Sequence, residues 1–253
     1  MSEDGAVGNH AGGPWLLRMQ WRRLLFVHWP VDAVALQRRL PPGLDLDTYQ
    51  GRGYIGVVPF AMRIAPRGVP YFGPLTDFPE INVRTYVRHR GGRAGVFFFS
   101  LDVPGALAVW VARTFFHLPY FTAKVACGVG GAGAGPVGSA DGAGAAASPE
   151  IHYKLEHPSR RFCGTYGAAG AVFRAQPGSF AHWATERYCL YSTDGRGGIF
   201  RGDIAHRPWP LQPARAGFEH AGMVEPFEGL GPQHPEVFYS EALDVWAAPI
   251  RRV

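Results

Sequence analysis

The sequence predicts a mainly β protein of the α+β kind, in which strands form a closed antiparallel barrel or a barrel-like sandwich with a few helices outside. Segments rich in aromatic and β-branched residues, bounded by Gly or Pro, recur along the chain. Helical segments are few, and strands and helices do not alternate regularly, as they would around a parallel sheet. A length of 253 residues suits one β domain of this size.

The individual elements follow from local patterns. Strands are predicted at 53–64, 80–88, 94–103, 150–157, 162–170 and 171–176. RYCLYS and GGIFRGDIAH flank the dipeptide Asp194-Gly195, which predicts a hairpin between them. Helices are predicted for DAVALQRRL with Asp32 as N-cap, for ALAVWVARTFFH at 106–117, and for SFAHWATER with Ser179 as N-cap.

Two segments are predicted to lie outside the packed domain. Residues 1–14 are small and polar, and residues 128–149 consist mostly of Gly and Ala, which offer no side chain large enough to bury. We therefore expect a disordered tail at 1–14 and a single domain at 15–253 that carries a flexible loop at 128–149.

Composition argues against several classes of protein. The net charge is +5, but the arginines are scattered in pairs and no run of five or six basic residues occurs, so a nucleic-acid partner is not predicted. Cys127, Cys163 and Cys189 are widely spaced and form no zinc or disulfide pattern. No cofactor, metal or membrane partner is expected, and the sequence shows neither a signal peptide nor an apolar membrane-spanning run. We expect a cytoplasmic protein.

The segment EINVRTYV at 80–87 is the strand most informative about function. Because side chains alternate between the two faces of a strand, Glu80, Asn82, Arg84 and Tyr86 share one face and apolar residues share the other. The polar face is either the solvated exterior of a half-buried sheet or the lining of a barrel interior that binds a polar small molecule. The next strand, VFFFSLD at 96–102, favours the interior, because Val96 and Phe98 on one face and Phe97, Phe99 and Leu101 on the other are all apolar.

Several motifs in order resemble a known family. The match to the YqjF-like family of uncharacterised bacterial proteins, domain of unknown function 2071, covers most of residues 21–215 except the Gly/Ala-rich segment. The motifs that resemble this family are RLLFVHWPVD, LPPGLDLDTYQG, GVVPFAM, FPEINVRTYV, GVFFFSLD, ARTFFHLPYF, TERYCLY and HRPW. That family is in turn similar to acetoacetate decarboxylase. The resemblance implies a closed β-barrel with a site inside it.

The resemblance also implies roles for particular residues. Glu80 resembles an active-site glutamate of the decarboxylase, Arg22 resembles an arginine before its first helix, and the segment from Arg113 to Tyr120 and Phe121 resembles the one that carries its two lysines. The Schiff-base lysine is absent at the matching positions, where Tyr120 and Phe121 stand. Lys124 remains a displaced candidate, although a lone lysine usually faces solvent.

Together these patterns predict a small-molecule site inside the barrel. Glu80 and Tyr120 are the candidate catalytic residues, and Arg22, Asn82, Arg84 and Arg113 are the candidate ligand-binding residues, for a carboxylate or an oxygenated aromatic compound. Two classes of function remain open: a lyase or related enzyme without Schiff-base chemistry, and a non-catalytic binding or sensing protein. A homo-oligomer is also left open.

Overall fold

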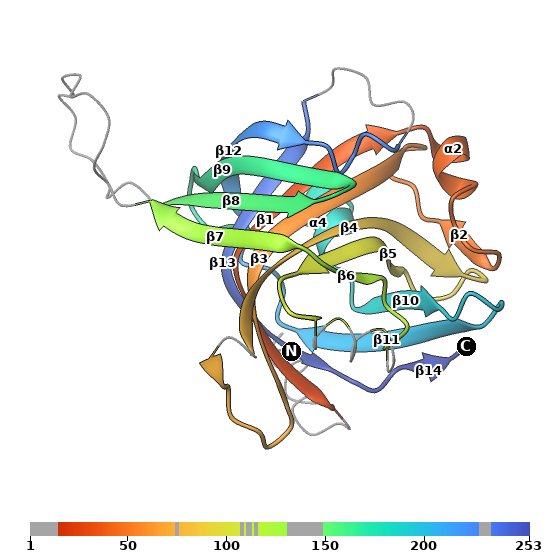
Figure 1. Cartoon of the computed structure of the whole chain (residues 1–253). Helices are drawn as coiled ribbons and strands as arrows, with labels where there is room; N and C mark the ends of the chain where they lie inside the picture. The colour runs from red at the N-terminus through yellow and green to blue at the C-terminus, as the bar shows by residue number, and fades with distance from the viewer. Residues whose placement is uncertain are drawn as a thin grey trace, which may run out of the picture.

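The computed structural model describes residues 15–73, 76–106, 109, 113, 116–130, 149–227 and 234–253. Strands dominate this part of the chain (Figure 1). The strands are β1 (Leu17–Val31), β2 (Leu44–Leu46), β3 (Gly53–Pro66), β4 (Asp77–His89), β5 (Gly95–Val103), β6 (Tyr120–Thr122), β7 (Lys124–Gly130), β8 (Glu150–His157), β9 (Arg160–Ala168), β10 (Cys189–Thr193), β11 (Ile199–His206), β12 (Gln212–Ala221), β13 (Glu236–Ala247) and β14 (Arg251–Arg252). The helices are α2 (Ala33–Gln37) and α4 (Phe180–Thr185).

The central strands close into a barrel-like ring. Hydrogen-bonded neighbours follow the order β11-β10-β5-β4-β3-β1-β13, and β13 pairs back onto β11 through Val245, Trp246 and Ala247. The contacts within the ring are antiparallel except for the short pairing of β10 with β5, which is parallel. The predicted mainly β, barrel-like architecture is confirmed, with this parallel contact as a departure from it.

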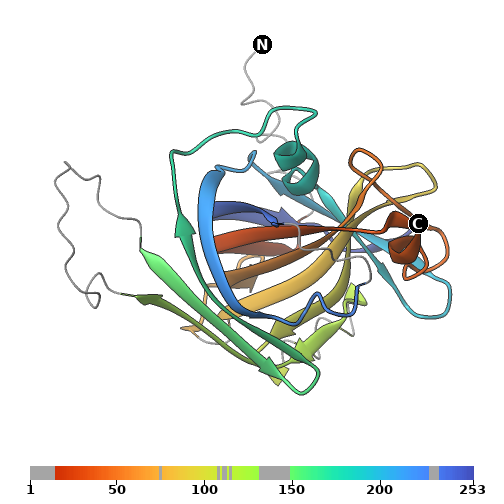
Figure 2. The same ribbon diagram turned by 90° about the horizontal axis from the view of Figure 1, so that it is seen from above.

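A second antiparallel sheet lies beside the ring. It runs in the order β12-β9-β8-β7 and joins the ring where Gln212 and Pro213 pair with β13 (Figure 2). Its apolar face packs against one face of β1, β3 and β4, where Ile81 and Val83 meet Tyr153 and Phe162 in a common core. Side chains on the other face of β4 therefore point away from the second sheet and into the ring.

A bulge in β1 sets which of its side chains enter the ring. The register of β1 with β3 shifts between Arg22 and Val27, and Arg23 adopts a left-handed φ of 53°. An extra residue in a strand reverses the alternation of its side chains. Phe26 and His28 after the bulge therefore share a face with Trp21 before it.

The predicted helix caps and the predicted hairpin are confirmed. Asp32 caps α2 by accepting a hydrogen bond from the Ala35 amide at 2.7 Å, and Ser179 caps α4 by accepting one from the His182 amide at 3.2 Å. The hairpin predicted at Asp194-Gly195 joins β10 to β11. Most of the helix predicted at 106–117 falls outside the described residues, as do residues 1–14.

Two sequence predictions were wrong in detail. The expected strand at 171–176 makes only an isolated bridge, between Phe173 and Leu211, because Val172 is 61% exposed and this run has no extended partner strand. Residues 128–130, expected in a flexible loop, belong to β7, which continues to Gly130; residues 131–148 of the expected loop lie outside the described residues. Within the described part of the chain, no helix is long and apolar enough to cross a membrane.

Candidate functional site

The polar row of β4 is buried. Glu80 is 2% exposed, Asn82 is 4% exposed and Tyr86 is fully buried, while Arg84 is half-buried. Glu80 lies opposite Phe60 and Asn82 lies opposite Val58, and both of these partners belong to the apolar core of the ring. The interpretation of this row as a solvated outer face is therefore wrong.

The neighbouring strand β5 contributes a different set of side chains from the one that simple alternation predicts. Its register with β4 shifts so that Arg84 lies opposite Phe98 but Val83 lies opposite Ser100. Leu101 consequently lies opposite Asn82, on the Glu80 side, and not with Phe97 and Phe99 as the alternation indicated. The bulge could not be inferred from the sequence, because no Gly marks it.

Glu80 and Tyr120 form a hydrogen-bonded pair. Strand β6 runs parallel to β5 with Tyr120 beside Leu101, which places the phenol over the Glu80 carboxyl. The Tyr120 hydroxyl donates to Glu80 Oε2 at 3.0 Å. The two residues predicted to be catalytic are thus in direct contact.

The electrostatics of this pair follow from burial. Removal from water raises the pKa of Glu80 to about 7, while hydrogen bonds from Tyr120 and Asn82 work in the opposite direction. Burial, together with the adjacent carboxylate, raises the pKa of Tyr120 well above its usual value. Near neutral pH, Glu80 is therefore present in both its protonated and its ionised form, whereas Tyr120 remains a hydrogen-bond donor.

Unused polar atoms lie further along the same strand face. Asn82 Oδ1 and Arg84 Nε are buried without a hydrogen-bond partner among the described residues. Buried polar groups are usually paired, and leaving one unpaired costs about 1–3 kcal/mol. A ligand with a donor for Asn82 and an acceptor for Arg84 would satisfy both atoms.

The other two arginines predicted to bind ligand do not join this cluster. Arg22 lies opposite Ala61 of β3, whereas Glu80 lies opposite Phe60, the residue before it. Because neighbouring residues in a strand point to opposite faces of the sheet, the Arg22 side chain is on the face away from Glu80. It pairs with Asp77 at 2.5 Å. Arg113 is exposed, with its guanidinium 5.1 Å from the centre of the Phe121 ring.

Both lysines of the sequence face solvent. Lys124 is exposed. The Lys154 side chain is 57% exposed and forms an ion pair with Glu156 at 2.7 Å. Neither position supports the idea of a displaced nucleophile near Glu80.

The structure adds a buried charge that sequence reasoning did not assign. Asp102 is fully buried on the face of β5 opposite to Glu80, and its Oδ1 accepts a hydrogen bond from Arg160 at 2.7 Å. The Arg160 guanidinium also lies 4.4 Å from the centre of the Phe121 ring, next to Tyr120. A carboxylate at the end of the largely apolar run VFFFSLD was the available signal.

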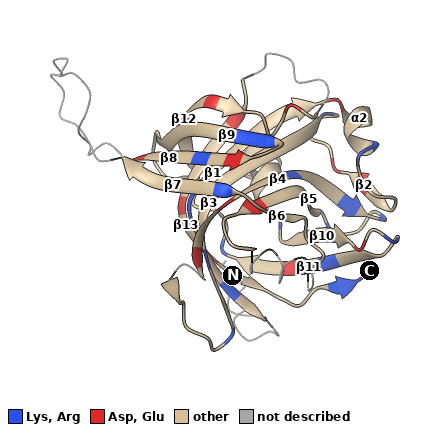
Figure 3. Ribbon diagram, in the orientation of Figure 1, with Lys and Arg blue, Asp and Glu red and all other residues tan. Residues whose placement is uncertain are grey.

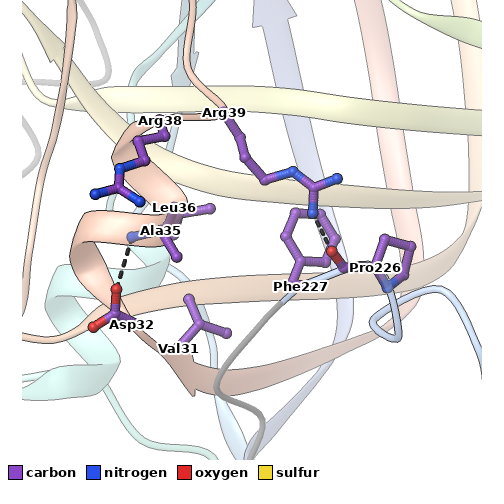
Figure 4. Close-up of a pocket in the computed structure, with 8 residues that line it drawn as sticks. All are labelled: Val31, Asp32, Ala35, Leu36, Arg38, Arg39, Pro226 and Phe227. Atoms are coloured by element: carbon purple, nitrogen blue, oxygen red, sulfur yellow. Dashed lines mark hydrogen bonds between the residues drawn. The ribbon is translucent and has the colours of Figure 1, made fainter.

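Two surface pockets lie apart from Glu80. One, of about 340 Å³, is formed where α2 meets the segment before residue 228; Arg39 there contacts the Pro226 carbonyl and packs on Phe227 (Figure 4). The second, of about 500 Å³, is lined by Arg39, Phe97, Phe98, Phe99, Arg113, His117, Leu118, Pro119, Tyr191, Ser192, Thr193 and Asp194.

Metal-ligating side chains are not clustered in the described residues. No group of three His, Cys, Asp or Glu side chains there lies close enough to hold a metal ion. Basic and acidic segments are interspersed over the strands (Figure 3).

Comparison with known proteins identifies the family. A family model described as an uncharacterized conserved protein, DUF2071, matches residues 18–244. The chain belongs to this family. A family relative, the uncharacterized protein YqjF of Bacillus subtilis (strain 168), is 37% identical over 243 residues, which cover 95% of this chain and 93% of the relative.

Solved structures show the same fold at low identity. The enduracididine biosynthesis enzyme MppR, complexed with pyruvate, superposes with a TM-score of 0.63 at 14% identity over 95% of this chain and 91% of that one. An acetoacetate decarboxylase-like enzyme from Sphingomonas wittichii RW1 gives a TM-score of 0.61 at 13% identity, with 95% and 94% covered. This DUF2071 member therefore has the acetoacetate decarboxylase-like fold that its motifs predicted.

Proposed function

We propose that the protein binds a small carboxylate or oxygenated aromatic compound inside the ring and that Glu80 exchanges a proton with it. In this proposal Glu80 is the general acid or base, Tyr120 donates a hydrogen bond to the reacting oxygen or to Glu80, and Asn82 and Arg84 bind the ligand. The observation that carries the proposal is a buried carboxyl with a pKa of about 7, in contact with a phenol that stays protonated.

The ligand class is supported by complementary chemistry. Arg84 provides a donor without a partner on the same face as Glu80, and guanidinium groups match planar oxyanions. A protein with the same fold holds pyruvate, a small 2-oxo carboxylate. The reaction would proceed without a Schiff base, because Tyr120 cannot condense with a ketone and both lysines are exposed.

The alternative is a binding or sensing protein that uses the same residues without turnover. Phe60, opposite Glu80, belongs to the apolar core of the ring, which would enclose a ligand bound there. The contacts of Glu80 with Tyr120 and Asn82, neither of which is a cation, favour the enzyme, because a carboxylate fixed in an ion pair would be a poor proton carrier.

A Glu80→Gln variant separates the two functions. A panel of 2-oxo acids and aromatic carboxylates is screened for binding by calorimetry and for conversion by mass spectrometry. An enzyme loses turnover in this variant while it retains ligand affinity. A binding protein converts none of the compounds before or after the substitution, and a protein that binds none of them contradicts the proposed ligand class.

A further inference from the structure

A second group of polar side chains meets inside the ring, beneath α4. His28, Gly56 and Arg84 lie side by side across β1, β3 and β4. A side chain at Gly56 would place its Cβ 3.3 Å from the Tyr86 hydroxyl and 3.4 Å from both Arg84 Cγ and His28 Cδ2. The glycine therefore leaves the space in which these three side chains converge, and His28 Nε2 lies 2.6 Å from the Tyr86 hydroxyl.

Arg187 enters the same group from the end of α4. Its Nε donates to the Trp183 carbonyl at 2.5 Å and its Nη1 to Asp47 Oδ2 at 2.5 Å, which fixes the orientation of the guanidinium. That guanidinium lies 5.0 Å from the centre of the Tyr86 ring, and the Arg84 guanidinium lies 5.9 Å from the same centre. Two cations thus approach one buried phenol.

The charges in this group do not balance. In the described part of the chain, the carboxylate that forms an ion pair with this group is Asp47, which binds Arg187. Asp47 also binds Arg88, at 3.0 Å. Burial and the nearby arginines hold the pKa of His28 well below its usual value, so the imidazole adds no charge at neutral pH. The excess positive charge of Arg84 and Arg187 favours binding of an anion.

Each guanidinium also retains an unused donor. The Arg187 side chain is 6% exposed and its Nη2 has no hydrogen-bond partner among the described residues, and the same holds for the buried Arg84 Nε. Aromatic rings lie against these donors: the Arg187 guanidinium is 4.8 Å from the centre of the Trp183 ring, which lies 4.4 Å from Tyr86 and 5.7 Å from Phe180, between ring centres.

We propose that Arg84 and Arg187 together bind the carboxylate of an aromatic carboxylic acid, whose ring packs among Tyr86, Phe180 and Trp183. Planar carboxylates match the guanidinium fork, and the aromatic walls suit an aromatic body better than a phosphate. The inference rests on the proposed function only in taking the ring interior as the ligand site.

The position of this site also constrains the substrate. Arg84 is four residues from Glu80 along β4, a separation of roughly 13 Å in an extended strand. An arylcarboxylate with a further functional group is long enough to contact both residues. The anionic end of the ligand would lie under α4 and its reacting end would lie at Glu80 and Tyr120.

The test uses benzoate as probe, with inorganic phosphate in a parallel titration. Binding is followed by thermal denaturation and by tryptophan fluorescence in the wild-type protein and in Arg84→Gln and Arg187→Gln. Arg88→Gln is the matched control, because Arg88 contacts the same Asp47 carboxylate from an exposed position. Arg84→Gln leaves the Asp47–Arg187 pair intact, so it remains informative if Arg187→Gln fails to fold.

We expect benzoate to raise the melting temperature in a saturable manner, with about tenfold or greater loss of affinity in Arg84→Gln and none in Arg88→Gln. Trp183→Phe should remove most of the fluorescence change and retain the thermal shift. Equal affinity in Arg84→Gln and wild type, no saturable benzoate effect, or protection by phosphate alone would overturn the assignment. Glu80→Gln should bind benzoate with the affinity of the wild-type protein. The benzoate titration therefore gives the same result whether or not Glu80 acts as an acid or base.

Discussion

The Tyr120 hydroxyl donates a hydrogen bond of 3.0 Å to Glu80 Oε2 within the ring of strands. The contact joins residues from β6 and β4, which are separated in the sheet by β5. It combines a carboxyl that titrates near neutral pH with a phenol that does not, which is the division of labour expected of an acid–base pair.

The raised pKa of Glu80 predicts a particular dependence of stability on pH. The folded protein releases the Glu80 proton at about pH 7 and the unfolded chain releases it near 4.5. The stabilisation from the protonated carboxyl is therefore fully present below pH 4.5 and is lost as pH rises to about 7, a decrease of about 3 kcal/mol in the free energy of unfolding. Urea denaturation at a series of pH values measures this decrease.

Glu80→Gln should remove that decrease, because a neutral amide has no charge to bury. The exposed Glu156 serves as the control, and Glu156→Gln should keep the wild-type profile. If the Glu80→Gln and wild-type profiles run parallel between pH 4.5 and 8, Glu80 does not titrate as expected.

Tyr120→Phe should raise the pKa of Glu80 further. The lost hydrogen bond stabilises the ionised carboxylate, so without it the protonated form persists to higher pH. Carboxyl ¹³C NMR of labelled glutamate follows the titration. Tyr188→Phe removes a similar bond, of 2.5 Å to Glu186, and should leave the Glu80 titration unchanged. An unchanged or lower midpoint in Tyr120→Phe would contradict the role given to this contact.

The proposed lack of Schiff-base chemistry is testable directly. Lys154 is bonded to Glu156, which raises the pKa of its ammonium, whereas a Schiff-base lysine needs a lowered one. Incubation with acetoacetate and borohydride should leave the intact mass unchanged, with an acetoacetate decarboxylase as positive control. A stoichiometric adduct on Lys124 or Lys154 would show that the lysine reaches a bound ketone.

Local sequence signals sufficed for much of the fold. The alternation in EINVRTYV located a strand whose polar face is buried, and Asp32 and Ser179 marked both described helices because capping depends on neighbouring residues alone. The strand β1 was not predicted, because its aromatic run is interrupted by Arg22 and Arg23 at a bulge that only pairing with β3 reveals. Long-range register is not encoded in a local pattern.

The candidate site was predictable in part for the same reason. The family resemblance placed Glu80 and Tyr120 in the same site, and alternation placed Asn82 and Arg84 beside Glu80, but the contact between Glu80 and Tyr120 was found only in the structure. Arg22 was misplaced because strand pairing puts it on the opposite face. Asp102 and Arg160 were not assigned because they come from strands far apart in the sequence and meet only when the second sheet packs on the ring.

The Asp102–Arg160 pair should be among the more sensitive points of the structure. Arg160→Gln leaves the fully buried Asp102 carboxylate without a cation, and breaking a buried ion pair in this way costs about 3–5 kcal/mol. Asp102→Asn should cost less, because the Arg160 side chain is 17% exposed and retains access to water. Urea denaturation of both variants measures the difference.

The double variant Asp102→Asn with Arg160→Gln should recover part of the loss, because no unpaired charge remains buried. Lys154→Gln breaks an exposed ion pair on the same sheet and should have no measurable effect. If Arg160→Gln is as stable as Lys154→Gln, the Asp102–Arg160 pair does not stabilise the fold, and Arg160 does not hold the second sheet against β5.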